Sequence, residues 1–250
     1  MALTESKPWV RWVSLLGFVI VWQVLASQLQ SPDLPSPVQV LLSLRTHLVS
    51  GELPYHLSIT LLRVLAAFVI AMSVGAAIGI VMGNSHRVDA LFDGLLVLGL
   101  NLPALVTIIL CYIWFGLTDV AAVTAVALNK IPTVVVTVRE GARAVDRHLL
   151  EVATAFRVPP LRTLRQVYLP QLYPYLMAAA RSGLALIWKI VLVVELLGRS
   201  NGVGFQLGTY FQFFDITSIL AYTVAFAAVV LAVEAILMRP LDRRIGRWRA

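Results

Sequence analysis

Residues 57–83 read LSITLLRVLAAFVIAMSVGAAIGIVMG, a run in which Arg63 is the single charged residue. A helix needs about 20 mostly apolar residues to cross the hydrocarbon core of a bilayer, and this run is long enough. Gly75, Gly79 and Gly83 recur at intervals of four and therefore share one face of such a helix. Small residues at this spacing let a second helix approach closely. The run predicts a membrane-spanning helix that packs against a neighbour through its glycines.

The composition of the whole chain agrees with a membrane location. Of its 250 residues, 59% are hydrophobic and 13% are charged, and the mean hydropathy is +0.85. Soluble domains carry roughly 25% charged residues. Runs of suitable length predict an all-α polytopic membrane protein with about six transmembrane helices, at about 12–28, 57–83, 91–115, 119–138, 173–197 and 218–238.

These runs predict one transmembrane domain over residues 1–250, with an N-terminal span at about 12–28 and core spans at about 57–238. The first run also resembles a signal peptide, since Lys7 and Arg11 precede an apolar stretch that ends near Ala26 and Ser27. Five further apolar runs favour an uncleaved anchor.

The positive charges indicate how the spans are oriented. The chain has 20 Lys and Arg against 13 Asp and Glu, a net charge of +7. Basic residues accumulate in cytoplasmic segments of membrane proteins. With both termini cytoplasmic, the outer segments hold only Arg45 and Arg199, and four basic residues fall within spans. The cytoplasmic segments then hold Lys7, Arg11, Arg87, Arg139, Arg143, Arg147, Arg157, Arg162, Arg165, Arg239, Arg243, Arg244, Arg247 and Arg249. This asymmetry explains the basic composition without nucleic acid.

Few residues suit catalysis or cofactor binding. Cys111 is the single cysteine, and the four histidines show no metal-ligand spacing. The sequence contains no GxxxxGK[ST] phosphate-binding loop. The chain is therefore predicted to be non-catalytic, with no metal and no cofactor of its own.

The predicted cytoplasmic segment at about 140–170 is amphipathic. Within it, residues 151–170 read EVATAFRVPPLRTLRQVYLP. A helix over 145–156 would place Val145, Leu149, Ala153 and Phe156 on one side. Pro159 and Pro160 would stop it, and a second short helix would end at Pro170. Such a pair of helices either lies on lipid headgroups or inserts into a groove of a soluble partner.

The same stretch resembles the EAA loop of ATP-binding-cassette (ABC) importer permeases. Glu151-Val152-Ala153 matches its first part, and Val167-Tyr168-Leu169-Pro170 matches its last part at the family spacing. Arg157 stands where the family has glycine, which can supply a left-handed turn. The resemblance implies that the coupling to ATPases is carried by Glu151, Val152, Ala153, Phe156, Arg157, Leu169 and Pro170.

The resemblance extends over nearly the whole chain. The segment from Leu34 to Phe68 resembles the entry region of nitrate/sulfonate/taurine permeases, and further matches are the Pro103 region, Trp114-Phe115-Gly116, Trp188 with Glu195, and Gly202-Val203-Gly204. It implies a type I (MetI-like) importer permease fold in the bacterial cytoplasmic (inner) membrane. The implied partners are a second copy of this chain, two ATPases that bind ATP and Mg, and an extracytoplasmic substrate-binding protein.

Polar residues within the predicted spans are candidates for the translocation path. They are Asn101, Asn129, Lys130, Trp188, Lys189 and Glu195. The excess of lysine over glutamate at depth favours an anionic solute, because a charge in a low-dielectric span needs water or a partner. Packing of Trp188, snorkelling of Lys130 and a salt bridge of Glu195 to another helix are alternatives.

Three readings of the function stay open. The first is an ABC importer permease for a small anionic solute of the nitrate, sulfonate or taurine kind. The second is the same class of transporter carrying a small aromatic or heterocyclic compound or a vitamin precursor. The third is an ion-coupled secondary transporter. Ionisable groups within the spans favour it, and the lack of detectable inverted repeats counts against it.

Overall fold

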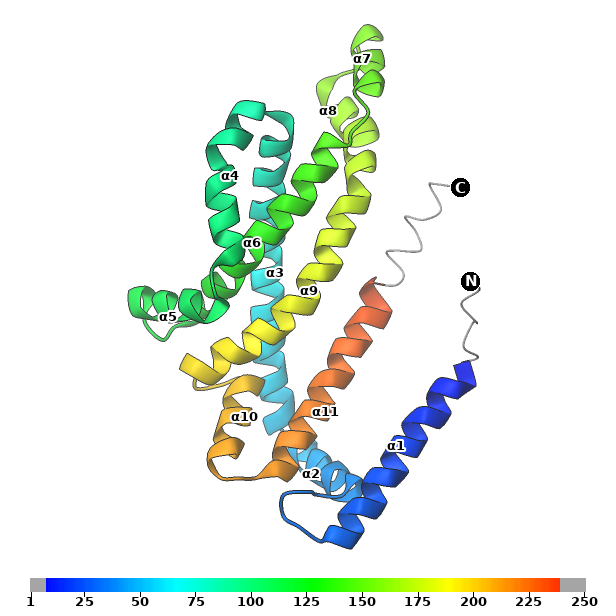
Figure 1. Cartoon of the computed structure of the whole chain (residues 1–250), viewed down its shortest axis with the longest axis vertical. Coiled ribbons are helices and arrows are strands. Elements are labelled where there is room, and N and C mark those ends of the chain that lie inside the picture. Colours follow the sequence, from blue (N-terminus) through cyan, green and yellow to red (C-terminus); the bar gives the residue numbers. More distant parts are fainter. Residues whose placement is uncertain (1–7, 239–250) are drawn as a thin grey trace.

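The computed structural model describes residues 8–238, and within them every regular element is a helix (Figure 1). Lys7 and the predicted cytoplasmic arginines from Arg239 onward lie outside the described residues. The elements are α1 (Pro8–Leu29), α2 (Pro37–Val49), α3 (Glu52–Asn84), α4 (His86–Asn101), α5 (Ala104–Phe115), α6 (Asp119–Arg143), α7 (Arg147–Ala155), α8 (Pro160–Thr163), the π-helical turn η1 (Leu164–Tyr168), α9 (Leu169–Gly198), α10 (Val203–Gln212), α11 (Ile216–Val233) and η2 (Glu234–Met238).

Each predicted span corresponds to helix in the structure, although the bounds differ. Four uninterrupted helical stretches are long and apolar enough to cross a membrane: Glu52–Asn84, Asp119–Arg143, Pro160–Gly198 and Ile216–Ile236. The pair α4 and α5 adds a fifth if it is counted as one bent span. The apolar portion of α1, Val13–Leu29, is shorter. The prediction of an all-helical polytopic membrane protein is confirmed.

The glycines of the opening run lie against α6, as predicted. A Cβ atom on Gly75 would stand 2.7 Å from the Cβ of Val134, and one on Gly79 would stand 2.8 Å from the carbonyl oxygen of Val135. Atoms do not approach this closely without a clash, so larger side chains would push α3 away from α6. The small face of α3 therefore sets the distance between these two helices.

The predicted third span at 91–115 is not one straight helix. It consists of the C-terminal part of α4 and the whole of α5, which meet at a bend of 98°. Pro103 has no N–H to continue the helical ladder, and Leu102 before it is extended, with ψ of 126°. Beyond the bend, the Tyr112 hydroxyl donates to the Val194 carbonyl oxygen at 2.7 Å. The bend and this contact direct α5 across the bundle toward α9.

The core lies where α3, α5, α6 and α9 meet. Small and branched residues fill it, among them Ala67, Ile108, Ala125 and Ile187, which are all buried. Many large apolar side chains of these helices do not face this core and are exposed. Exposed apolar surface on this scale is exceptional in a soluble monomer and normal for helices that face lipid.

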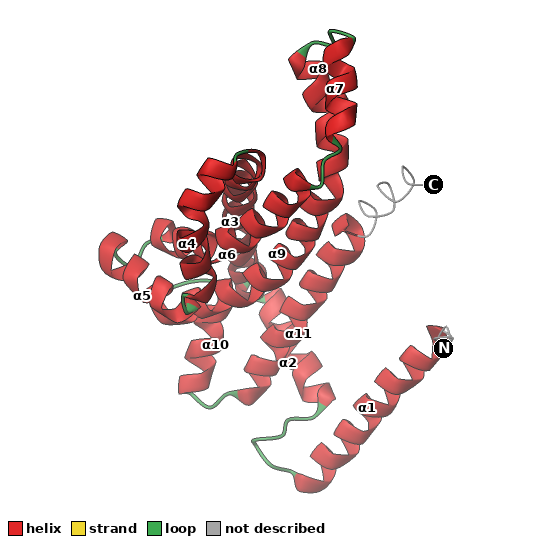
Figure 2. Cartoon of the chain, turned by 45° about the horizontal axis from the view of Figure 1, so that its top comes forward, coloured by secondary structure: helices red, strands yellow, loops and turns green. Residues whose placement is uncertain are grey.

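Two parts of the chain stand away from this bundle. Helix α1 lies to one side of the bundle and is joined to it through α2 (Figure 2). The Trp22 Nε1–H of α1 donates to the carbonyl oxygen of Pro35, which precedes α2, at 3.0 Å. Helix α2 begins with a capping box formed by Ser36 and Gln39 and packs on α11. At the opposite end, α7 and α8 project beyond the other helices in both views.

Candidate functional site

The projecting tip begins with α7, which is capped by its own sequence. The Asp146 carboxylate accepts a hydrogen bond from the His148 N–H at 2.9 Å and so acts as the N-cap. Glu151 takes no part in this cap and points to solvent, with 74% of its side chain exposed. Its carboxylate lies 3.5 Å from His148 Nδ1 on the same helix. The charge of Glu151 is therefore available to a partner.

Arg157 ends α7 in the left-handed conformation that the family glycine would adopt. Its φ is +50°. The Val158 N–H donates to the Ala153 carbonyl oxygen at 2.9 Å, and the Arg157 N–H donates to that of Thr154 at 2.9 Å. This pair of bonds is a Schellman motif, in which glycine is the preferred residue. The left-handed turn that glycine can supply in the family is therefore present here, although the residue is an arginine.

Arg157→Gly should stabilise the tip, because a left-handed conformation costs a non-glycine residue about 1–2 kcal/mol and glycine's extra flexibility returns part of that gain. We expect a net gain of about 0.5–1 kcal/mol, seen as slower amide hydrogen exchange in residues 147–158. Arg162→Gly is the matched control: it removes the same side chain from α8, where glycine is a poor helix former. Equal effects of the two substitutions would contradict the cap assignment.

Some residues of the apolar face predicted for the tip are buried in the structure and others are exposed. Ala153 is 6% exposed and Val145 is 7% exposed, so both face inward, and Val145 belongs to the cluster that contains Tyr168 and Leu172. Phe156 is 80% exposed and Val152 is 51% exposed. The prediction that Ala153 and Phe156 share one docking side is wrong, because the η1 turn packs beside α7 and only the Ala153 side is buried. Phe156, Val152 and Leu149 form the exposed apolar tip of α7.

The second short helix does not end at Pro170. Helix continues from Pro160 to Gly198 over 39 residues, with Leu169 half-buried and Pro170 exposed within it. The π-helical turn just before Pro170 explains this, since the Leu169 N–H donates to the Leu164 carbonyl oxygen five residues back. The wider turn changes the hydrogen-bond register where proline contributes no donor. The part of the tip from Pro160 onward is thus continuous with α9.

Lys130 lies between α6 and α9 rather than on an open surface. Its side chain is 1% exposed, and its Nζ has no hydrogen-bond partner within residues 8–238. A Cβ atom on Gly183 would stand 2.9 Å from Lys130 Cε, so the glycine provides the space that the lysine fills. Neighbouring Asn129 is half-buried and donates to the Ala125 carbonyl oxygen of its own helix.

Lys189 is exposed on another side of α9. It lies six residues after Gly183, about 240° around the helix, so the structure does not bring Lys130 and Lys189 together. Trp188 is 5% exposed and packs edge-on against Phe226 with ring centroids 5.7 Å apart. Asn101 is exposed at the end of α4 and donates to the Val97 carbonyl oxygen. The six candidates for the path are therefore dispersed.

Glu195 is held by α3. Its side chain is fully buried, and Arg63 Nη1 donates to its Oε1 at 2.7 Å. The Thr60 hydroxyl and the Gly204 N–H also donate to the carboxylate, each at 2.9 Å. The alternative of a salt bridge between helices thus describes Glu195, and a pair with Lys189 is not formed.

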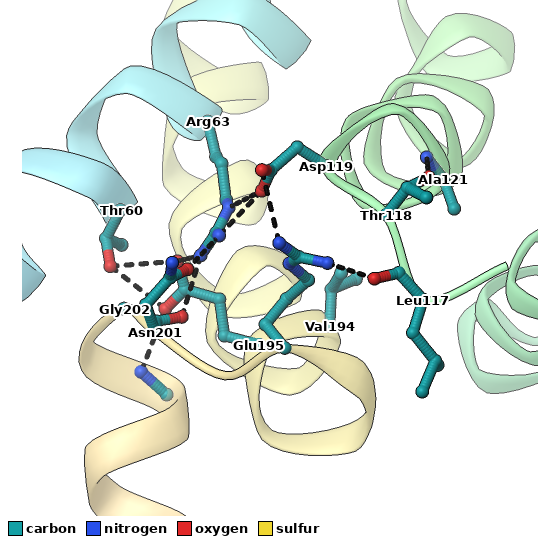
Figure 3. A network of polar contacts seen from close by, with 12 residues as sticks. Thr60, Arg63, Leu117, Thr118, Asp119, Ala121, Val194, Glu195, Asn201 and Gly202 are labelled. Carbon is teal, nitrogen blue, oxygen red and sulfur yellow. Dashed lines mark hydrogen bonds and ion pairs between the residues drawn. The ribbon is translucent and has the colours of Figure 1, made fainter.

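Arg63 also joins Glu195 to a second carboxylate, which the sequence analysis did not single out (Figure 3). Its Nε and Nη2 donate to Asp119 Oδ1 at 2.8 and 2.6 Å. Arg199 Nη2 donates to the other oxygen of Asp119 at 3.1 Å. We call Arg63, Asp119, Glu195 and Arg199 the outer charge network. A signal was present in the sequence, since opposite charges lie near the same predicted ends of different spans.

A second network lies near the α3–α4 turn. Arg139 Nη1 contacts Asp89 Oδ1 at 3.1 Å and Asp93 Oδ1 at 2.6 Å, and Arg143 also contacts Asp89. Helix α6 extends to Arg143, five residues beyond the predicted span, because these arginines reach back to α4. The two networks fasten α6 at both ends.

Comparison with known proteins gives consistent matches. The sequence profile of the family described as "Binding-protein-dependent transport system inner membrane component" matches residues 74–247. The putative aliphatic sulfonates transport permease protein SsuC of Bacillus subtilis (strain 168) is 30% identical over 244 residues, covering 96% of this chain and 88% of its own length. The taurine transport system permease protein TauC of Escherichia coli (strain K12) is 28% identical over 233 residues, covering 91% and 84%.

The fold also matches solved structures. A chain in the crystal structure of an amino acid ABC transporter with histidines superposes with a TM-score of 0.62 over 82% of this chain and 97% of its own. The two sequences are 21% identical, so this likeness concerns the arrangement of helices alone.

Proposed function

This chain belongs to the family of binding-protein-dependent transport system inner membrane components and is a non-catalytic permease subunit of an ABC importer; we propose that its solute is a small anion of the sulfonate or taurine kind. The relatives named for aliphatic sulfonates and taurine support this class of solute. The observation that carries the proposal is the exposed Lys189 on a membrane-spanning helix.

Lys189 lies nine residues before the end of α9, about 14 Å along the helix axis. Exposed apolar residues surround it on this side of α9, among them Leu186 and Val193. A lysine facing hydrocarbon at this depth costs roughly 2.5–3.5 kcal/mol by insertion scales. This side of α9 therefore faces water or protein in the assembled importer, and the charge favours anions there.

The tip of α7 supports the proposed orientation and partners. The 39-residue helix that carries it is about 58 Å long, which exceeds a hydrocarbon core of about 30 Å. We place the projecting end with α7 in the cytoplasm because the arginines of this segment follow the positive-inside rule, and we place both termini on the same side of the inner membrane. Two copies of this chain would each present one tip to one of two ATPases, which bind the ATP and Mg that this chain does not.

The opposite end of the chain offers a surface to the substrate-binding protein. The last turn of α10 and the α10–α11 connection expose Phe211, Phe213 and Phe214 by 68%, 76% and 81%. Aromatic side chains are enriched in protein interfaces because they cover much area with few rotatable bonds. We assign this loop to contact with the delivering protein.

Lys189→Gln tests the assignment of the solute. In proteoliposomes that contain the complete importer, this substitution should reduce uptake of the sulfonate at least about tenfold, because a charged contact is worth roughly 1.5–3 kcal/mol. Lys189→Arg keeps the charge and should retain most of the uptake. Assembly and basal ATP hydrolysis serve as controls. Unchanged sulfonate uptake by the glutamine variant, or transport of a neutral heterocycle in preference, would refute the anionic path.

A further inference from the structure

We propose that Arg63 and Arg199 form a receiving site for the anionic group of the solute, and that the Asp119 carboxylate occupies this site as a tethered stand-in. The inference deepens the proposed function and rests on it for the choice of a sulfonate. It places the first contact with solute at the outer charge network, where α3, α6 and the α9–α10 connection meet (Figure 3).

The geometry is that of an anion held between two guanidinium groups. Two nitrogens of Arg63 donate to one oxygen of Asp119, at 2.6 and 2.8 Å, and Arg199 donates to the other at 3.1 Å. The side chains of Arg63 and Arg199 are 5% and 11% exposed, whereas that of Asp119 is 60% exposed. The cations are thus built into the protein, and the anion stands at the surface.

The two arginines are positioned by other groups as well. Arg63 Nη1 also donates to the Asn201 carbonyl oxygen at 2.9 Å and to buried Glu195 at 2.7 Å. Arg199 Nη1 donates to the Leu117 carbonyl oxygen. These contacts remain when Asp119 leaves. The site is therefore not created by the aspartate, and another anion would find both guanidinium groups in place.

The site also has donors beyond those that a carboxylate uses. Arg199 Nε is buried and has no acceptor within residues 8–238. A sulfonate has three acceptor oxygens where a carboxylate has two. Asp119 is the first residue of α6, and the positive end of that helix dipole also favours an anion.

Exposure and hydrogen bonding identify Asp119, rather than Glu195, as the exchangeable carboxylate. The network contains two arginines and two carboxylates, so it is neutral when Asp119 is seated. Glu195 has no exposed surface and four hydrogen-bond contacts, whereas Asp119 is open to solvent. A tethered carboxylate competes at a high effective concentration. Free solute should therefore bind the native site weakly, and solute released by a docked binding protein would meet it at high local concentration.

The test is the binding of methanesulfonate to the intact permease–ATPase complex in detergent, followed as a rise in the thermal unfolding midpoint at constant ionic strength. In Asp119→Ala the concentration that gives half of the maximal rise should be at least about tenfold lower than in the native complex, since the competing charged contact is gone. Adding Arg199→Gln to this variant should abolish the gain.

Asp93→Ala is the matched control, because Asp93 is 51% exposed and lies 2.6 Å from Arg139 in the network near the α3–α4 turn. A methanesulfonate response of Asp119→Ala no stronger than that of Asp93→Ala would overturn the site, as would a gain that survives Arg199→Gln. Asp119→Asn is judged by the same criteria if the alanine variant does not assemble. This test measures binding and not uptake. A complex that binds methanesulfonate but does not transport sulfonates would therefore refute the proposed solute without refuting the site.

Discussion

Arg63→Met will lower the thermal unfolding midpoint of the permease by roughly 6–20 °C. The substitution leaves Glu195, which has no exposed surface, without its counter-ion. Removing one partner of a buried ion pair costs about 3–5 kcal/mol, because the other charge cannot return to water. In a protein of this size 1 kcal/mol corresponds to roughly 2–4 °C. Differential scanning fluorimetry of the purified protein in detergent measures the shift.

The double variant separates this explanation from a simple loss of packing. Arg63→Met combined with Glu195→Gln removes both buried charges, and it should recover a large part of the stability that Arg63→Met loses. Arg139→Met is the control at the other network, where Asp93 and Glu140 are about half exposed and buried Asp89 keeps Arg143 as its partner. Equal losses from Arg63→Met and Arg139→Met, or no recovery in the double variant, would show that the buried pair does not govern stability.

The outer charge network also illustrates which features the sequence predicts. The span containing Arg63 was predicted because apolar length is a local property, and its glycine face was predicted because spacing defines a helix face. The partner of Glu195 was not predicted, since the pairing depends on how α3 and α9 are rotated relative to each other. That rotation is set by contacts between residues more than a hundred positions apart, such as the Thr60–Glu195 hydrogen bond.

The broken third span was predictable from the sequence only in part. Pro103 indicates where a helix will be interrupted. The angle of 98° depends in addition on contacts beyond the bend, such as that of Tyr112 with Val194. Likewise, the family pattern has a glycine at the position of Arg157, and the structure has a left-handed turn there although the residue is an arginine. The inward orientation of Ala153 depends on how the η1 turn packs beside α7, which the motif does not specify.

Phe156→Asp should nearly abolish productive association with the ATPases. Phe156 is 80% exposed at the tip of α7, so the permease itself gains no buried charge from the substitution. If the tip inserts into a groove of the ATPase, however, the new carboxylate becomes buried there without a partner. A penalty of about 3–5 kcal/mol corresponds to a more than 100-fold weaker complex. Co-purification of the ATPase and solute-stimulated ATP hydrolysis measure the effect.

Two matched substitutions decide what a loss of association means. Val49→Asp places the same charge on a residue that is also 80% exposed, at the end of α2 far from the tip, and should leave ATPase association intact. Ala153→Asp puts the charge on the inward side of α7, where Ala153 is 6% exposed, and should lower the thermal stability of the permease before any partner is added. Phe156→Asp should do the reverse, with native thermal stability and no association. Normal association of the Phe156→Asp permease would place the ATPase contact elsewhere, because a groove that accepts phenylalanine cannot take a carboxylate at no cost.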